Sequence, residues 1–117
     1  MLKGENKMAV TDQNVIDGIA FDEENKTLIL EIYDHLNFEG KFEFEHLVIL
    51  QDKLNTYLWY INSKQYEESY PNKNFEKFVI NIHFKFKITE NCKKYINQSN
   101  LKIEPLNVQI IQYYTNS

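Results

Sequence analysis

The sequence predicts an α+β fold: a two-layer sandwich of order ββαβαβ, with two helices on one face of a four-stranded, mostly antiparallel sheet. Two observations lead to this prediction. Residues 77–87 alternate between apolar and mainly polar side chains, which is typical of a strand that covers a core on one side only. Residues 43–63 instead carry leucine or isoleucine at every third or fourth position, which is the period of an amphipathic helix.

The remaining elements follow in order along the chain. Residues 15–21 and 26–34 are short apolar strands joined by the turn sequence Asp-Glu-Glu-Asn, so they are expected to form a hairpin. Thr89 is placed to cap a second, shorter helix that runs to residue 100. Residues 106–114 form the last strand. Phe86 and Leu106 are expected to point inward with the other apolar residues of their strands.

The length of the chain, 117 residues, is enough for one hydrophobic core but not for two. Residues 1–14 are polar and aperiodic, and we expect them to be a flexible N-terminal tail. Residues 15–117 then form a single α+β domain. Translation can start at either Met1 or Met8, and the sequence does not choose between them.

Composition and charge argue against several functional classes. There are 13 basic residues, all lysine, against 17 acidic residues, which gives a net charge of −4. An acidic protein repels polyanions and attracts basic proteins, so we expect no nucleic-acid partner. The single cysteine, Cys92, suits a reducing cytoplasm. No apolar run approaches the ~20 residues that span a bilayer, and no signal peptide is recognisable, so we expect a cytoplasmic protein without a membrane partner.

Residues able to carry chemistry are few. The three histidines lack the spacing of a metal-binding motif, and only Asp34, His35 and His46 could form a corner that binds a metal or a small ligand. Cys92 lies on the inner side of the short helix, where we expect a buried, inert thiol. Three glycines cannot form a phosphate-binding loop. We therefore predict no catalytic residues, no metal and no cofactor, and we do not expect an enzyme.

The long helix carries more apolar and aromatic side chains than one face can hold. Val48 and Trp59 lie together outside the arc that faces the sheet, and Ile49 and Tyr60 form a ridge on the far side. The second helix or the loop at 66–71 can cover one of these flanks. Covering both would take more protein than the chain offers, so we expect an exposed contact surface on this helix.

The outer face of the sheet is a second candidate contact surface. It is expected to show Tyr33, His83 and Tyr113 among amide and aliphatic side chains, a mixture that resembles an interface more than a charged solvent face. The other interpretation is an ordinary half-apolar exposed sheet. The complete set of candidate partner-binding residues is Ile49, Trp59, Tyr60, Tyr66, Tyr70, Tyr33, His83 and Tyr113.

Five segments together resemble an uncharacterised family of small bacterial proteins classed as a domain of unknown function. The segments are H-L-x-x-L-Q-x-K-L-x-x-Y-L-x-x-I-x-S at 46–63, V-I-D-x-I at 15–19, D-H-L at 34–36, Y-P at 70–71 and V-I-N-I-x-F-K at 79–85. The sequence departs from that pattern at Phe38, where we expect tryptophan, and at Lys64, where a helix-ending glycine is usual. The resemblance supports the architecture and implies no catalytic residues.

The sequence as a whole favours a non-catalytic protein-interaction module. Small acidic proteins rich in aromatic residues are similar in general character to bacterial immunity proteins, which bind and neutralise a toxin. Many toxin nucleases are basic, and an acidic binder associates quickly with a basic partner. The partner is therefore expected to be a protein, most concretely a basic toxin domain. Self-association into a homodimer is the alternative, and a small-ligand or metal-binding protein that uses the Asp34, His35 and His46 corner comes next.

Overall fold

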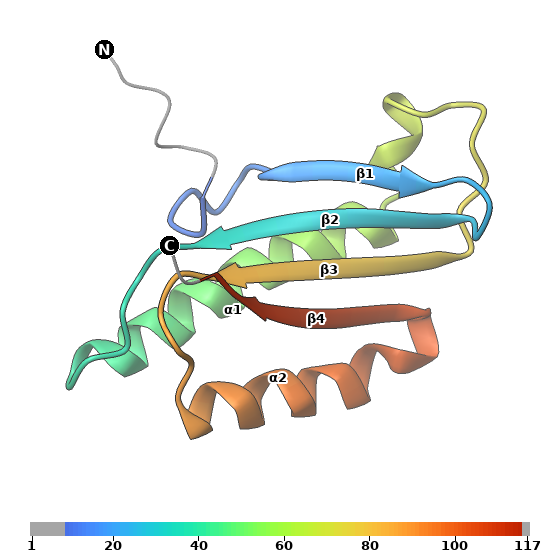
Figure 1. Cartoon of the computed structure of the whole chain (residues 1–117). Helices are drawn as coiled ribbons and strands as arrows, with labels where there is room; N and C mark the ends of the chain where they lie inside the picture. The colour runs from blue at the N-terminus through green and yellow to red at the C-terminus, as the bar shows by residue number, and fades with distance from the viewer. Residues whose placement is uncertain (1–8, 116–117) are drawn as a thin grey trace, which may run out of the picture.

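Four strands and two helices follow one another in the predicted order ββαβαβ, which confirms the α+β architecture. The computed structural model describes residues 9–115 (Figure 1). The elements are β1 (Gly18–Asp22), β2 (Thr27–Asp34), α1 (Phe42–Asn62), η2 (Gln65–Glu68), β3 (Lys77–Phe84), α2 (Glu90–Ile103), η3 (Glu104–Leu106) and β4 (Val108–Tyr114).

The sheet is mixed rather than mostly antiparallel, and its strand order is β1-β2-β3-β4. Only the β1–β2 hairpin is antiparallel, whereas β2–β3 and β3–β4 are parallel pairs. The reason is that α1 and α2 each return the chain to the starting end of the sheet, and such a crossover joins parallel strands. Both crossovers advance in the same direction across the sheet. With the usual right-handed connection, both helices then lie on one face, as α1 does behind the strands in Figure 1.

A single hydrophobic core fills the space between the sheet and the helices. Alternate residues of the three long strands point into it, and one side of each helix closes it. Its buried members from these elements are Leu28, Leu30, Ile32, Ile80, Ile82, Phe84, Val108 and Ile110 of the strands, with Leu50, Leu54, Tyr57, Ile61, Cys92, Ile96 and Ile103 of the helices.

The last two strands are shorter than the predicted ranges. β3 ends at Phe84, so Phe86 lies beyond it and is exposed rather than inward. β4 begins at Val108, because the short helical turn η3, with Pro105 in its first turn, holds Leu106 on the surface. The prediction of a helix cap is confirmed: the Thr89 hydroxyl accepts a hydrogen bond from the Cys92 backbone N–H at 3.1 Å.

Residues 9–17, most of which were assigned to the tail, are packed against β2 and α1. Val10 is fully buried, and its N–H donates to the Tyr33 carbonyl at 3.0 Å. The Tyr33 N–H in turn donates to Asp17 Oδ2 at 3.0 Å. β1 does not reach this end of β2, so these bonds satisfy backbone groups that lack a strand partner. The packed domain therefore begins before residue 15, and residues 1–8 lie outside the described residues.

Lys53 fixes this segment to α1. Its ammonium group is completely buried and donates to three oxygens, those of the Asp12 and Val15 carbonyls and Asp17 Oδ1, the last at 2.7 Å. A buried charge is tolerated when it is paired and its hydrogen bonds are satisfied. The only lysine of α1 is therefore turned into the protein instead of into solvent.

Candidate interaction surfaces

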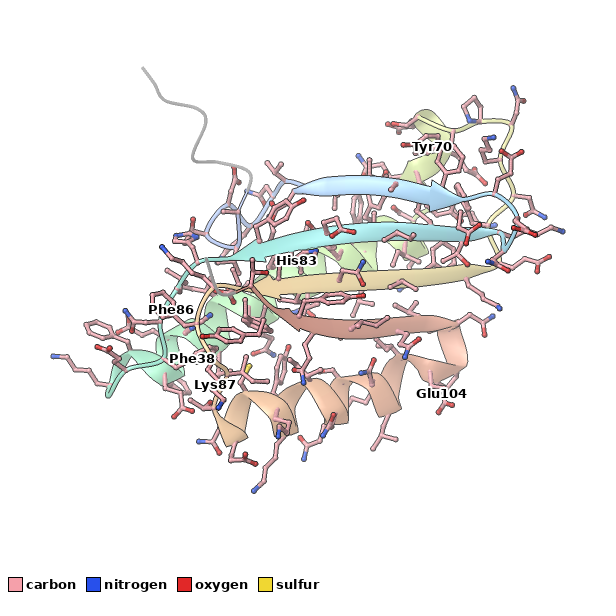
Figure 2. The ribbon with its side chains drawn as sticks, in the orientation of Figure 1. Phe38, Tyr70, His83, Phe86, Lys87 and Glu104 are labelled. Carbon is pink, nitrogen blue, oxygen red and sulfur yellow. The ribbon has the colours of Figure 1, made fainter. Side chains whose placement is uncertain are left out.

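The face of the sheet opposite the core is covered by no helix of the described residues, and it faces the viewer in Figure 2, with His83 labelled on it. We call the eleven side chains of β2, β3 and β4 on this side the open sheet face. They are Thr27, Ile29, Glu31, Tyr33, Lys77, Val79, Asn81, His83, Gln109, Ile111 and Tyr113. Glu31 is the only acid among them, and Lys77, at the first position of β3, is the only lysine.

Three predicted contact residues form a row across this face. Tyr33, His83 and Tyr113 occupy matching positions on neighbouring strands. The His83 ring is stacked between the two tyrosines, with centroids 5.4 Å from Tyr33 and 5.2 Å from Tyr113. The rings cover one another's faces, so the row presents ring edges to solvent. Tyr33 and Tyr113 are each 45% exposed. Such a row can pack beneath a partner surface, while it leaves no gap between its rings for a nucleobase.

Glu31 lies beside this row and is held by two neighbours. His83 Nε2 hydrogen-bonds one carboxylate oxygen, and Asn81 Nδ2 donates to the other at 3.1 Å. Gly18 lies opposite on β1, where an added Cβ would come within 3.2 Å of Glu31 side-chain atoms. The single acid of the open sheet face is therefore already hydrogen-bonded to neighbouring side chains of the same face. The strand alternation placed Glu31 and Asn81 on this face, but it gave no signal that they join His83.

The expected ridge of Ile49 and Tyr60 is not an exposed surface. Both side chains are half-buried and pack against the core. Burial is also the main cause that raises the pKa of Tyr60 above its ordinary value. Residues 9–17 cover this side of α1 through Lys53, and Tyr66 follows the end of the helix with its ring centroid 6.3 Å from that of Tyr60.

Tyr66 and Tyr70 belong to an aromatic cluster that closes the same end of the core. Tyr66 is only 6% exposed. Tyr70 is half-buried and meets the Phe21 ring edge-on at a centroid distance of 5.2 Å. The Phe75 ring lies 5.6 Å from Tyr66 and 6.1 Å from Tyr70. These two candidate residues therefore lie apart from the row on the open sheet face, and their aromatic rings have neighbours within the chain.

The outward side of α1 keeps the apolar surplus that the sequence indicated. Trp59 is 61% exposed, Phe44 is 74% exposed and Val48 is 38% exposed. Neither the second helix nor the 66–71 loop covers the flank of Val48 and Trp59. Trp59 is thus the only one of the predicted helix contacts that lies fully on the surface.

The Asp34 and His46 corner is a buried, hydrogen-bonded pair. His46 Nε2 lies 2.8 Å from Asp34 Oδ1 and 2.6 Å from Oδ2, while Nδ1 lies 2.9 Å from the Asn37 carbonyl oxygen. Both ring nitrogens lie within hydrogen-bond distance of these oxygens, so the imidazole is already engaged inside the protein. His35 is exposed. Among the described residues, no three histidine, cysteine or carboxylate side chains are grouped to hold a metal ion.

The Cys92 side chain is buried and offers no reactive thiol. Burial raises the pKa of the Cys92 thiol to about 12, which keeps it protonated and unreactive.

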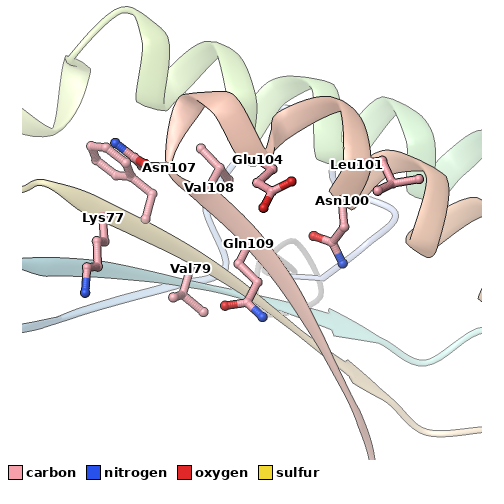
Figure 3. A pocket seen from close by; sticks show the side chains of 9 residues that line it. Lys77, Val79, Asn100, Leu101, Glu104, Asn107, Val108 and Gln109 are labelled. Carbon is pink, nitrogen blue, oxygen red and sulfur yellow. The ribbon is translucent and has the colours of Figure 1, made fainter.

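A hollow of about 550 Å³ lies where β4 meets the end of α2 (Figure 3). The Asn100 amide beside it bonds both backbone groups of Ile110, at 2.7 and 3.1 Å. This contact occupies the free edge of β4 at Ile110, where another strand would otherwise pair.

Comparisons with known proteins place the chain in a family. Residues 8–116 match the family described as "Family of unknown function (DUF6572)". Searches of the curated proteins and of the solved structures found no match. None of the described helices combines the length and the apolar character needed to cross a membrane. Because the match covers nearly the whole chain, the expected membership of a family of unknown function is confirmed, and the protein belongs to the DUF6572 family of unknown function.

Proposed function

We propose that the protein is a non-catalytic, cytoplasmic protein-interaction module and that the open sheet face is its main contact surface. The observation that carries this proposal is the composition of the face. The eleven residues of the face include one acid, Glu31, which is held by His83 and Asn81, and one lysine, Lys77, at the first position of β3, so no unpaired acid or lysine lies at the centre of the face. Depletion of charge together with aromatic side chains is characteristic of the buried centre of protein interfaces.

The most concrete form of this function is a bacterial immunity protein that binds and neutralises a toxin. The net charge of −4 supports it, because an acidic binder is steered toward a basic toxin domain. The rigid row of Tyr33, His83 and Tyr113 also supports it, since stacked rings lose little conformational freedom when a partner binds.

The first test is the gene neighbourhood, where an adjacent toxin gene supports the immunity role and its absence argues against it. If such a gene is found, the chain is expressed together with that toxin and survival of the host cells is measured. Wild-type protein should protect, and the double variant Tyr33→Ala/Tyr113→Ala should lose protection while it keeps its thermal midpoint. Leu101→Ala is a matched control, because it removes an exposed side chain from α2. Full protection by the double variant would show that the open sheet face is not the contact surface.

Self-association is the second candidate function, and the low charge of the open sheet face favours it. Two copies of a chain of net charge −4 repel one another through most of their surfaces, but this face adds little repulsion because Glu31 is paired with His83. Light scattering on the purified chain separates the two candidates. A particle of twice 14.1 kDa supports the homodimer, and a particle of 14.1 kDa excludes it.

A further inference from the structure

We propose that the outward side of α1 docks a basic partner protein, as a second contact surface distinct from the open sheet face. The proposal rests on the proposed function, because it names the chemistry of the partner. The surface is a stripe along the helix, formed by Phe44, Val48, Asp52, Asn55 and Trp59, with Glu45 beside it. Steps of three or four residues align these positions on one side of the helix, over about 22 Å.

The stripe combines exposed apolar groups with a shortage of cations. Phe44, Val48 and Trp59 are exposed large hydrophobic side chains, which single out a surface when they align on one element. Glu45 and Asp52 are exposed carboxylates of the same side. The only lysine of α1, Lys53, is buried in its bonds to residues 12–17. The exposed side of a 21-residue helix therefore carries acid and no base of its own.

The acidic character continues past the end of the helix. Trp59 shares a hollow of about 470 Å³ with Glu67 and Glu68 of η2. The carbonyl end of α1 points the same way and adds partial negative charge. Lys64, which also lines the hollow, is the one cation there, so two carboxylates and the helix end outweigh it.

The chemistry of the partner follows from this pattern. An ammonium or guanidinium group of the partner would be attracted by Asp52, by Glu45 and by the hollow beside Trp59, whose indole face is the best aromatic partner for a cation. Apolar side chains of the partner would cover Phe44 and Val48. An acidic or neutral partner would gain nothing from these carboxylates. The complementary partner is a basic protein surface with apolar groups among its lysine or arginine side chains.

Trp59 gives the proposal a direct readout, because it is the only tryptophan of the chain. The probe is an amphipathic helical peptide of lysine and leucine, added to the full-length protein at low salt while tryptophan emission is followed. Saturable change of Trp59 emission that weakens as salt rises is the expected result. The matched peptide with glutamate in place of lysine should leave the emission unchanged.

Two double charge-reversal variants distinguish binding at the α1 surface from a general effect of net charge. Glu45→Lys/Asp52→Lys should weaken binding of the lysine peptide by about tenfold or more. Glu76→Lys/Glu104→Lys changes the net charge equally at exposed positions outside α1, and should weaken binding by no more than about twofold. Equal weakening by both pairs, or no binding of the lysine peptide to wild-type protein, would overturn the proposal.

The outcome is distinguishable from failure of the proposed function. The Tyr33→Ala/Tyr113→Ala variant should bind the lysine peptide as wild type does, because both tyrosines lie on the other side of the molecule from α1. If the peptide fails to bind but toxin protection still depends on Tyr33 and Tyr113, the α1 surface is excluded and the open sheet face stands.

Discussion

His46 Nε2 lies 2.6 Å from Asp34 Oδ2, and the two side chains are 1% and 0% exposed. Asp34 ends β2, and His46 stands in the second turn of α1, so the pair ties the sheet to the helix that follows it. The Phe38 ring lies over the imidazole with a centroid distance of 3.9 Å (Phe38 is labelled in Figure 2). Phe38, which belongs to the loop between β2 and α1, therefore shields this pair from water.

Replacing one partner of this pair should destabilise the fold strongly. His46→Ala leaves the buried Asp34 side chain without its hydrogen-bond partner, and such a loss costs about 1–3 kcal/mol of unfolding free energy, or more for a charged group. Urea unfolding measures it, and His35→Ala is the control because His35 is exposed. A loss of less than about 1 kcal/mol for His46→Ala would contradict the structural role of this hydrogen-bonded pair.

Lys53→Met should loosen residues 9–17 as well as destabilise the domain. The substitution removes three hydrogen bonds and leaves Asp17 buried without its ammonium partner, at a cost of about 3–5 kcal/mol. Hydrogen exchange should speed up at the Val10 and Tyr33 amides, which this segment protects. Lys94→Met, on the exposed side of α2, is the matched control and should change neither quantity. Unchanged exchange at Val10 would mean that Lys53 does not hold the segment.

Lys64→Gly should stabilise the protein. Lys64 follows the end of α1 in the left-handed conformation, with φ of 59°, where a side chain with a Cβ is strained and glycine is not. The gain in unfolding free energy should be about 0.5–1 kcal/mol, and thermal or urea unfolding measures it. Asn55→Gly, within the helix, should instead lose a few tenths of a kcal/mol, because glycine is a poorer helix former than asparagine. Destabilisation by Lys64→Gly would contradict the described helix end.

Stability should fall as the pH rises above about 9. Burial raises the pKa of Cys92 from its ordinary 9.0 to about 12, and raises that of Tyr57 above its ordinary 10.0. In the unfolded chain these groups lose their protons at the ordinary values, whereas the folded chain retains them. The free energy of unfolding therefore drops by up to about 1.4 kcal/mol per pH unit for each group.

Urea unfolding at steps between pH 8 and pH 11 measures this dependence. Cys92→Ala should make the decline shallower between pH 9 and pH 10, since Tyr57 contributes only above its ordinary value of 10.0. An unchanged slope in that variant would show that the Cys92 thiol ionises equally in both states.

The sequence was enough to predict the element order because each element has a clear period. Residues 77–84 alternate except at Val79, and α1 repeats its leucines every three or four positions. The helices between the later strands imply parallel pairing. The sequence prediction missed this, because it assumed that the antiparallel pairing of the β1–β2 hairpin applied to the whole sheet. The family resemblance and the Thr89 cap depend on residues that are close together in the sequence, so both could be predicted from it.

The packing around α1 could not be predicted, because it depends on contacts between distant residues. Val10 lies in a polar stretch, and nothing local shows that it fills the core. A lysine such as Lys53 ordinarily faces solvent, so its bonds to residues 12–17 have no sequence signal. The alternation of β2, β3 and β4 did place Tyr33, His83 and Tyr113 on one face. The strand register that brings their rings into contact could be learned only from the structure.

The most direct test of the open sheet face as a contact surface is the size of the protein in a lysate of the cells that make it. The wild-type chain should elute from a sizing column as a complex larger than its own 14.1 kDa, and Tyr33→Ala/Tyr113→Ala should elute as the free chain with an unchanged thermal midpoint. Elution of wild type as the free chain, or of both forms in the same complex, would contradict the account.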